Sequence, residues 1–403
     1  MNVPRDAALP RLGLLLDPVA MTPLLARSLG CPAEVGLARI ARIAYTPGAR
    51  AIVHYEVPVD GRTENAVAFV KAGRDLAARA RRAPLPELAA QVNGRSPAAT
   101  PVVYDAEARA LLTWLPLDPR LPALAEPPSR LAGRLARAGV QAAPGVEPTI
   151  VPESYKPRVR IVLRLGRHVL KAYGDERSYE RGLTGLRLAG STPWRTPRLE
   201  AGFRDLRLTV QAAVDGSAPT PAAAAVTAGE LVQRLQAARV APARAATPEL
   251  LLALAEEKAA LAAHLLPDLE PRLTRLLRRL RRSLPRARVL VPAHGDFDAD
   301  QLLASGDGEP VVLDFDDLCL AAPALDLATY MADVVRGREE DRRTLAAVRE
   351  ALLAGYGMRP AALEWHLAVV VVARVAHSFQ RAEHAWAERA AGMVRAAEEA
   401  LAG

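Results

Sequence analysis

The chain has 403 residues, half of them hydrophobic, so it can bury substantial cores and is long enough for two or three domains. Its formal charge of +8 comes with 53 basic residues, of which only 4 are lysines. The arginines are scattered along the whole chain and form no basic tail. This distribution is compatible with phosphate-bearing ligands and argues against nucleic acid as a partner.

Cysteine content and hydropathy argue against a disulfide-stabilised protein and against a membrane-spanning one. Cys31 and Cys319 permit no disulfide framework, which favours a reducing compartment. The longest late apolar run, Leu367 to Ala373, ends at Arg374 and is far too short to cross a bilayer. An early apolar run is interrupted at Asp17, unlike a signal peptide. We therefore expect a cytoplasmic protein without a membrane partner; its oligomeric state is not indicated.

The first third of the chain predicts helices followed by a β-hairpin. Residues 1 to about 35 have a helical character with proline breaks. After them, residues 38–57 and 66–70 alternate or cluster β-branched and apolar side chains on either side of the turn Val59-Asp-Gly-Arg62. An Asp-Gly turn between two such runs is a strong hairpin signal.

The hairpin pattern occurs a second time. Tyr45 and Tyr155 each begin a Tyr-x-Pro-x-x-Arg segment that runs into an apolar strand, and a further strand ends on Lys71 or Lys171. A helical stretch, a Thr-Pro pair and a strand with a central Leu-Thr follow each lysine in the same order. This order predicts two related β-rich units, each a small sheet with one helix. Two unrelated α+β segments are the alternative.

Composition suggests where the domains meet. Residues 126–148 are rich in Pro, Ala and Gly around one short amphipathic helix with Leu131 and Leu135, which indicates a linker. A further break falls at 217–221. We expect an N-lobe-like cap or repeat domain at 1–125, a linker at 126–150, a nucleotide-binding N-lobe at 151–215 and a helical C-lobe at 216–403.

Within the C-lobe, residues 272–282 place leucines on one helix face and arginines on the other. A solvated arginine face is the default interpretation. Nucleic-acid binding along 272–288 is the alternative, and it predicts an affinity that falls steeply with salt. The segment from Pro360 to Ala402 predicts one or two further helices.

The clearest chemical signal is His294-Gly-Asp-Phe-Asp-Ala-Asp-Gln301, followed by Val311-Val-Leu-Asp-Phe-Asp-Asp317. Two short apolar strands each deliver a carboxylate, Asp296 and Asp314, to a turn. A phosphoryl-transfer site needs one acid that accepts a hydroxyl proton. It also needs a second acid and an amide that hold a metal, which neutralises the phosphates.

Such a site also needs a strand lysine that grips nucleotide phosphates and a helix acid that orients it. Lys171 ends the strand at 167–171, and the helix predicted at about 176–189 carries Glu180. The helix after Lys71 contains no glutamate before Glu87. We therefore assign the nucleotide to the second β-rich segment, the one with Lys171, and keep Lys71 as a possible anchor for the nucleotide phosphates.

With these residues identified, the sequence resembles the aminoglycoside phosphotransferase and choline kinase-like small-molecule kinases, remote relatives of protein kinases. The resemblance covers about residues 151–340 and rests on His294-Gly-Asp296, Gln301, Asp314 and Pro323-x-x-Asp-Leu-Ala328. It implies an α+β, protein-kinase-like bilobal fold with a β-rich N-terminal lobe and a helical C-terminal lobe. The first unit is similar to an additional, duplicated N-lobe.

The resemblance also implies roles for these residues in ATP-dependent transfer to a hydroxyl group of a small molecule. Asp296 would be the catalytic base, Gln301 and Asp314 would hold Mg²⁺, and Asp326 would buttress the catalytic loop. His294 is expected to support the loop and not to carry a proton.

Other acids near the motif have more than one interpretation. Asp298 and Asp300 flank the base and are either solvated loop acids or substrate contacts. Asp316 either assists the metal or caps a following helix.

Gln301 departs from the family, which usually has asparagine at this position. Glutamine keeps the amide oxygen and adds one methylene, while Mg²⁺ demands tight octahedral geometry. A catalytically impaired pseudokinase that binds nucleotide or a protein partner is therefore the alternative to an active kinase.

Overall fold

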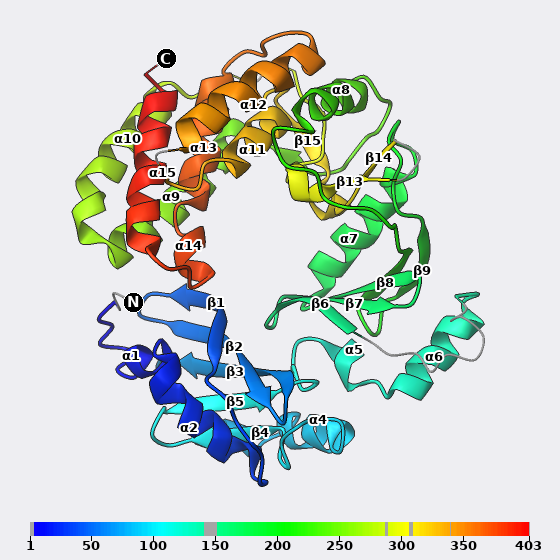
Figure 1. The fold of residues 1–403 in the computed structure, drawn as a ribbon, viewed down its shortest axis with the longest axis vertical. Helices are drawn as coiled ribbons and strands as arrows, with labels where there is room; N and C mark the ends of the chain where they lie inside the picture. Colours follow the sequence, from blue (N-terminus) through cyan, green and yellow to red (C-terminus); the bar gives the residue numbers. More distant parts are fainter. Residues whose placement is uncertain (1–3, 141–150, 287–288, 306–308, 339, 403) are drawn as a thin grey trace. The chain divides into compact units, whose positions relative to one another are not determined.

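The computed structural model describes residues 4–140, 151–286, 289–305, 309–338 and 340–402 (Figure 1). The chain folds as two compact units. Unit 1 comprises Met1–Tyr179, Glu200–Gln211 and Phe379–His384, and unit 2 comprises Glu180–Leu199, Ala212–Ser378 and Ala385–Gly403. The four segments expected from the sequence divide the chain more finely and stay a prediction. Residues 141–150 of the expected linker lie outside the described residues.

Unit 1 begins with α1 (Leu12–Leu15) and α2 (Pro18–Leu29), as the early helical character predicted. The first sheet follows, with strand order β1-β2-β3-β5-β4. Its strands are β1 (Arg39–Thr46), β2 (Arg50–Val59), β3 (Arg62–Lys71), β4 (Val102–Asp105) and β5 (Ala110–Trp114).

The predicted hairpin is confirmed between β2 and β3. The two strands pair antiparallel from Arg50 opposite Lys71 to Val59 opposite Arg62. Asp60 and Gly61 make the turn with φ angles of 47° and 75°. Positive φ at both central residues is what a two-residue hairpin turn of this kind requires, and it explains the Asp-Gly pair.

Two short helices, α3 (Leu76–Ala80) and α4 (Leu85–Val92), follow β3, where the sequence predicted one helix. The prediction is wrong here because Pro84 stands between the two helices, and proline cannot continue a helix that precedes it; Pro86 lies in the first turn of α4, where proline is tolerated. Buried side chains of both helices join a hydrophobic cluster with the first sheet: Ile52, Val67, Phe69, Leu76, Leu85 and Val92.

The second sheet has strand order β6-β7-β8-β10-β9, the same order as the first. Its strands are β6 (Val151–Lys156), β7 (Arg160–Leu165), β8 (His168–Tyr173), β9 (Leu199–Phe203) and β10 (Leu208–Ala212). The β1–β2 turn contains Gly48 at φ 67°, and the β6–β7 turn contains Arg158 at φ 63°. These shared features support the predicted relation between the two β-rich segments, which stays a prediction.

Part of the expected linker is packed. Helices α5 (Pro122–Ala125) and α6 (Pro128–Arg137) precede the second sheet. The buried leucines of α6, Leu131 and Leu135, share a hydrophobic cluster with Ile161 of β7 and Val210 of β10. The amphipathic pattern of α6 therefore marks the side of the helix that contributes to a core.

After β8 comes α7 (Glu176–Ala189), with the bounds that the sequence predicted. The remaining long helices of unit 2 are α8 (Ala225–Gln236), α9 (Pro248–Leu265), α10 (Glu270–Arg282), α11 (Leu325–Asp333), α12 (Asp341–Tyr356), α13 (Leu363–Arg374) and α15 (Trp386–Ala400). With the short α14 (His377–Gln380), three helices follow Pro360, against one or two predicted. Ala382 and Ala385, both at positive φ, interrupt the helical path.

Helix α10 has the two faces that its sequence indicated. Leu273, Leu276 and Leu280 are buried in the large core of unit 2. On the polar face, Arg272 pairs with Glu398, Arg281 bonds to Glu256, and Arg279 donates to the carbonyl of Leu401. Protein groups thus engage three of the six arginines of α10, and residues 287–288 of the face that the nucleic-acid alternative requires lie outside the described residues.

Short strands and turns in unit 2 carry the residues of the acidic motif at 294–317. The strands β11 (Ala245–Ala246), β15 (Cys319–Ala321) and β12 (Val291–Ala293) form one sheet, and β13 (Leu302–Ala304) pairs with β14 (Pro310–Val312). The described part of unit 2 also contains the 3₁₀ turns η1 (Pro267–Leu269), η2 (Ala299–Gln301) and η3 (Phe315–Asp317). Among the described residues, no helix is long and apolar enough to span a membrane.

Candidate active site

Strand β12 ends at Ala293 and delivers His294, Gly295 and Asp296 to the loop that follows. Gly295 has a φ of 87°, and a Cβ atom at this position would lie 2.3 Å from the carbonyl oxygen of Asp317. Both the backbone angle and the close approach require glycine. The loop therefore lies directly against the turn after β14.

Asp326, at the start of α11, fixes the backbone just before Asp296. Its side chain is fully buried and accepts hydrogen bonds from the backbone N–H groups of His294 at 2.8 Å and of Gly295 at 2.9 Å. Burial raises the pKa of Asp326, while His294 and the two backbone donors oppose that rise. Each carboxylate oxygen thus satisfies one buried backbone donor of the loop.

His294 joins the loop to the second acidic strand end. Its side chain is buried, and Nε2 donates to the carbonyl of Leu313 at 2.8 Å. The ring packs within 6.0 Å of the rings of Trp194, Phe297 and Phe315, by centroid distance. Leu313 immediately precedes Asp314, so the imidazole connects the backbone of the two acid-bearing turns.

Gln301 and Asp314 emerge at the ends of paired strands. Leu302 of β13 lies opposite Val312 of β14, and the N–H of Leu313 donates to the carbonyl of Gln301 at 2.8 Å. Asp314 adopts a left-handed backbone conformation, with φ 55° and ψ 73°. This conformation is uncommon for a residue other than glycine and is concentrated at functional sites.

The donor chemistry of this pair fits magnesium, because Mg²⁺ prefers carboxylate and carbonyl oxygens and commonly keeps water and phosphate ligands. In the described ranges, no set of three or more His, Cys, Asp or Glu side chains is placed to hold a metal ion. Asp316 is buried within η3. The next helix, α11, has Ala324 at its N-cap, so the capping alternative for Asp316 is wrong.

An acidic group surrounds the loop after Asp296. Asp298 is half-buried, and its Oδ1 atom is buried without a hydrogen-bond partner. Burial raises the pKa of Asp298 to about 7, with further contributions from Asp296, Asp333 and Asp300 and an opposing one from Arg374. At neutral pH this carboxyl group therefore exchanges between its protonated and ionised forms.

Arg374 is a site residue that the sequence did not reveal. Its Nη2 atom lies 3.3 Å from Oδ1 of Asp296, whose side chain is 54% exposed, while the arginine side chain is only 15% exposed. The available signal was that Arg374 is the charge that ends the apolar run of α13. Nothing in the sequence indicated that α13 directs this charge toward Asp296.

The part of α7 that belongs to unit 2 packs against the η3 turn. A Cβ atom at Gly185 would lie 2.1 Å from the carbonyl oxygen of Phe315, so this contact also requires glycine. Arg244 and Arg181 approach Asp317 at 2.5 Å and 3.8 Å. Glu180, the predicted acid of α7, is half-buried.

The two candidate lysines differ in their surroundings. Lys171 is 7% exposed on β8, and its Nζ atom lies 5.6 Å from the ring centroid of Tyr173. Lys71, at the end of β3, is exposed. Lys171 belongs to unit 1 and Glu180 to unit 2, and their pairing stays a prediction.

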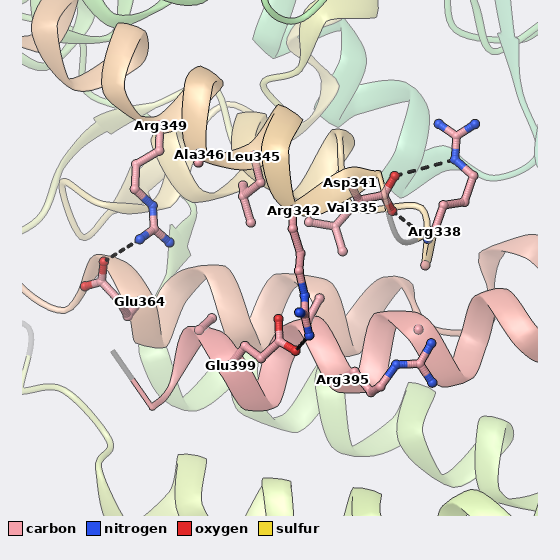
Figure 2. A pocket seen from close by; sticks show the side chains of 14 residues that line it. Val335, Arg338, Asp341, Arg342, Leu345, Ala346, Arg349, Glu364, Arg395 and Glu399 are labelled. Carbon is pink, nitrogen blue, oxygen red and sulfur yellow. Dashed lines mark hydrogen bonds and ion pairs between the residues drawn. The ribbon is translucent and has the colours of Figure 1, made fainter.

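A separate cavity of about 440 Å³ lies among α12, α13 and α15 (Figure 2). None of the predicted site residues lines it. Three of its arginines each reach a carboxylate: Arg338 to Asp341, Arg342 to Glu399, and Arg349 to Glu364. Its charges are therefore largely balanced within the protein.

The mixed α+β fold carries the acidic loop between short strands, and the class of protein, a phosphotransferase, is identified by the sequence family. The sequence model of the phosphotransferase enzyme family matches residues 57–367, and the chain belongs to this family. The match begins before the second β-rich segment, so it is wider than the resemblance at 151–340. No curated protein sequence matches the chain.

Solved structures with a similar fold include three bacterial proteins. A choline/ethanolamine kinase family protein from Mesorhizobium loti is 14% identical, with 68% of this chain and 95% of that chain covered and a TM-score of 0.47. Aminoglycoside phosphotransferase APH(3'')-Id from Streptomyces rimosus is 18% identical, with 59% of this chain and 96% of that chain covered and a TM-score of 0.46. A putative aminoglycoside phosphotransferase from Ralstonia eutropha is 14% identical, with 68% of this chain and 97% of that chain covered and a TM-score of 0.49. Because these TM-scores are below 0.5, membership of the family rests on the sequence match.

Proposed function

We propose that the protein transfers the terminal phosphoryl group of ATP to a hydroxyl group of a small molecule of the aminoglycoside, sugar or amino alcohol type. The observation that carries the proposal is the hydrogen bond from His294 to the carbonyl of Leu313. It connects the loop of Asp296 to the residue before Asp314. A base and a metal ligand on connected, rigid backbone are what phosphoryl transfer requires, because its catalysis is mostly positioning and electrostatics.

In this proposal, Asp296 accepts the proton of the acceptor hydroxyl. Asp326 keeps the loop of Asp296 in place through the two backbone hydrogen bonds. Gln301 and Asp314 would hold Mg²⁺, which supplies neutralisation of the phosphate charge. Lys171, oriented by Glu180, would anchor the nucleotide phosphates, as strand lysines do in kinases.

The acidic group around Asp298 supports an acceptor that carries hydroxyl and amino groups. Burial and the charges of Asp296, Asp300 and Asp333 raise the pKa of Asp298, and the one cation that acts on it, Arg374, opposes the rise. The unpartnered Oδ1 of Asp298 is an acceptor for a substrate hydroxyl or ammonium group. A chain with a net positive charge can thus still present a locally acidic acceptor site.

The test is phosphoryl transfer from ATP with Mg²⁺ across a panel of aminoglycosides, sugars and amino alcohols, with the phosphomonoester identified by ³¹P NMR. We expect Asp296→Asn to lower kcat by about 10²–10⁴-fold, the range for loss of a positioned base. Asp268→Asn, which changes an exposed aspartate on η1, is the matched control and should leave kcat unchanged. Unchanged turnover in Asp296→Asn would remove this residue from the mechanism.

A catalytically impaired pseudokinase is the second candidate function. It is favoured by the ion pair between Arg374 and Asp296, which engages the proposed base, and by Gln301 in place of asparagine. This candidate predicts binding of Mg-ATP, measured by calorimetry, without a phosphomonoester from any acceptor. It also predicts that Gln301→Asn combined with Arg374→Ala restores turnover. Turnover by the unmodified protein would refute it.

A further inference from the structure

A second charged pocket lies in unit 1, outside the proposed catalytic site. Its volume is about 600 Å³, and it lies beside the end of β3, the helix α3 and the β6–β7 turn. Five cationic side chains line it, from both β-rich segments: Lys71, Arg74, Arg79, Arg82 and Arg158. The single acid in the lining, Asp75, accepts a hydrogen bond from the N–H of Ala78 at 2.8 Å.

The five cations are not paired with carboxylates at ion-pair distance in the described part of the chain, although the charge of Asp118 acts on Arg158. None of them forms an ion pair or a side-chain hydrogen bond among the residues that the structure describes. The cavity in Figure 2 is the opposite case, since Arg342 and Arg349 each reach a glutamate there. Like charges that converge without acids repel one another, and a bound anion is the direct way to relieve this repulsion.

Arg158 is held in place for such an anion. Its backbone N–H donates to the buried Asp118 at 2.7 Å, which secures the left-handed turn at φ 63°. Its guanidinium carbon lies 4.8 Å from the ring centroid of Phe69, within the range of a cation–π interaction.

The surroundings of Arg158 are strongly positive. Burial lowers the pKa of Arg158, Asp118 raises it, and the charges of Arg120, Arg79 and Arg50 lower it further. Arginine remains protonated in proteins. The half-buried guanidinium therefore keeps its charge in surroundings where three arginines oppose the single favourable charge of Asp118.

We propose that this pocket binds a small ligand through a di- or triphosphate chain. Guanidinium groups present planar forks that match phosphate oxygens in a bidentate way, and bonds of this kind are among the strongest hydrogen bonds. Five cations around one concave volume suit several phosphates on one molecule. Nucleic acid would need an extended basic track, whereas these cations converge on one cavity. The pocket contains neither Asp296 nor Lys171 but does include Lys71, the alternative anchor for the nucleotide, so a Lys171→Met variant is needed to separate this binding from the proposed catalytic site.

The experiment uses the full chain and two probes, inorganic tripolyphosphate and ADP, each titrated by calorimetry without magnesium at low ionic strength, where charge screening is weak. We expect saturable, one-to-one binding of tripolyphosphate that persists in Lys171→Met. Arg79→Gln should weaken it about tenfold, the loss of one charge-assisted contact. Arg81→Gln is the matched control, because Arg81 is exposed in the same segment but does not line the pocket. It should change the affinity less than twofold.

The two probes distinguish the sources of the phosphate chain. Tighter binding of ADP that is also weakened by Arg79→Gln assigns a nucleotide, and equal affinities assign the phosphate chain alone. Circular dichroism of both arginine variants verifies folding. The proposal is overturned if no saturable binding occurs, if Arg81→Gln weakens binding as much as Arg79→Gln, or if Lys171→Met abolishes it. Saturable binding of single-stranded RNA in preference to both probes would also overturn it.

Discussion

Asp298 gives the sharpest quantitative prediction, because its raised pKa links the acidic loop to the free energy of unfolding. The pKa of this carboxyl group rises from 3.8 to about 7, mainly through burial. Above pH 7 the ionised form is therefore less stable in the folded protein than in the unfolded chain. At about 1.36 kcal/mol per pKa unit, the cost at pH 8 is about 4 kcal/mol.

The sign follows from proton binding. Between pH 3.8 and about 7 the folded protein retains a proton on Asp298 that the unfolded chain has lost, so stability from this group falls as pH rises through that window. Asp298→Asn removes the ionisation and keeps the shape of the side chain. We expect the variant to gain about 1.7 kcal/mol over the unmodified protein at pH 5 and about 4 kcal/mol at pH 8.

The assay is urea denaturation of both proteins at pH 5 and pH 8, with the free energy of unfolding obtained by linear extrapolation. Asp268→Asn, at an exposed position on η1, is the control and should show no such pH-dependent gain. A difference between Asp298→Asn and the unmodified protein that is the same at both pH values would refute the assignment of the titration to Asp298.

Two further substitutions test the catalytic loop. Asp326→Asn replaces one accepting oxygen by an amide group and leaves one buried N–H of His294 or Gly295 without an acceptor; we expect a loss of about 1–3 kcal/mol in unfolding free energy. We also expect kcat to fall by a larger factor than KM changes. Unchanged stability would show that the two backbone hydrogen bonds to Asp326 do not hold the loop. Gly295→Ala adds a Cβ atom 2.3 Å from the Asp317 carbonyl at a positive φ, so the loop must shift. Turnover should fall at least tenfold, and a variant with full turnover would show that the loop tolerates the shift.

The sequence by itself determined the features that depend on neighbouring residues. The Asp60-Gly61 turn, the bounds of α7 and the apolar face of α10 follow from backbone preference and periodicity, which are local. The acidic motif was recognisable for the same reason. Asp296 and Gln301 lie in one short segment, and the apolar strands β13 and β14 mark where the chain turns.

The tertiary structure alone decided which distant residues meet. Arg374 reaches Asp296 because α13 packs inside unit 2, and periodicity identifies a buried helix face without identifying what it faces. Likewise, Arg158 joins Lys71 at one pocket although they belong to different β-rich segments. Such contacts depend on how elements pack, and the sequence pattern of each element is compatible with several partners.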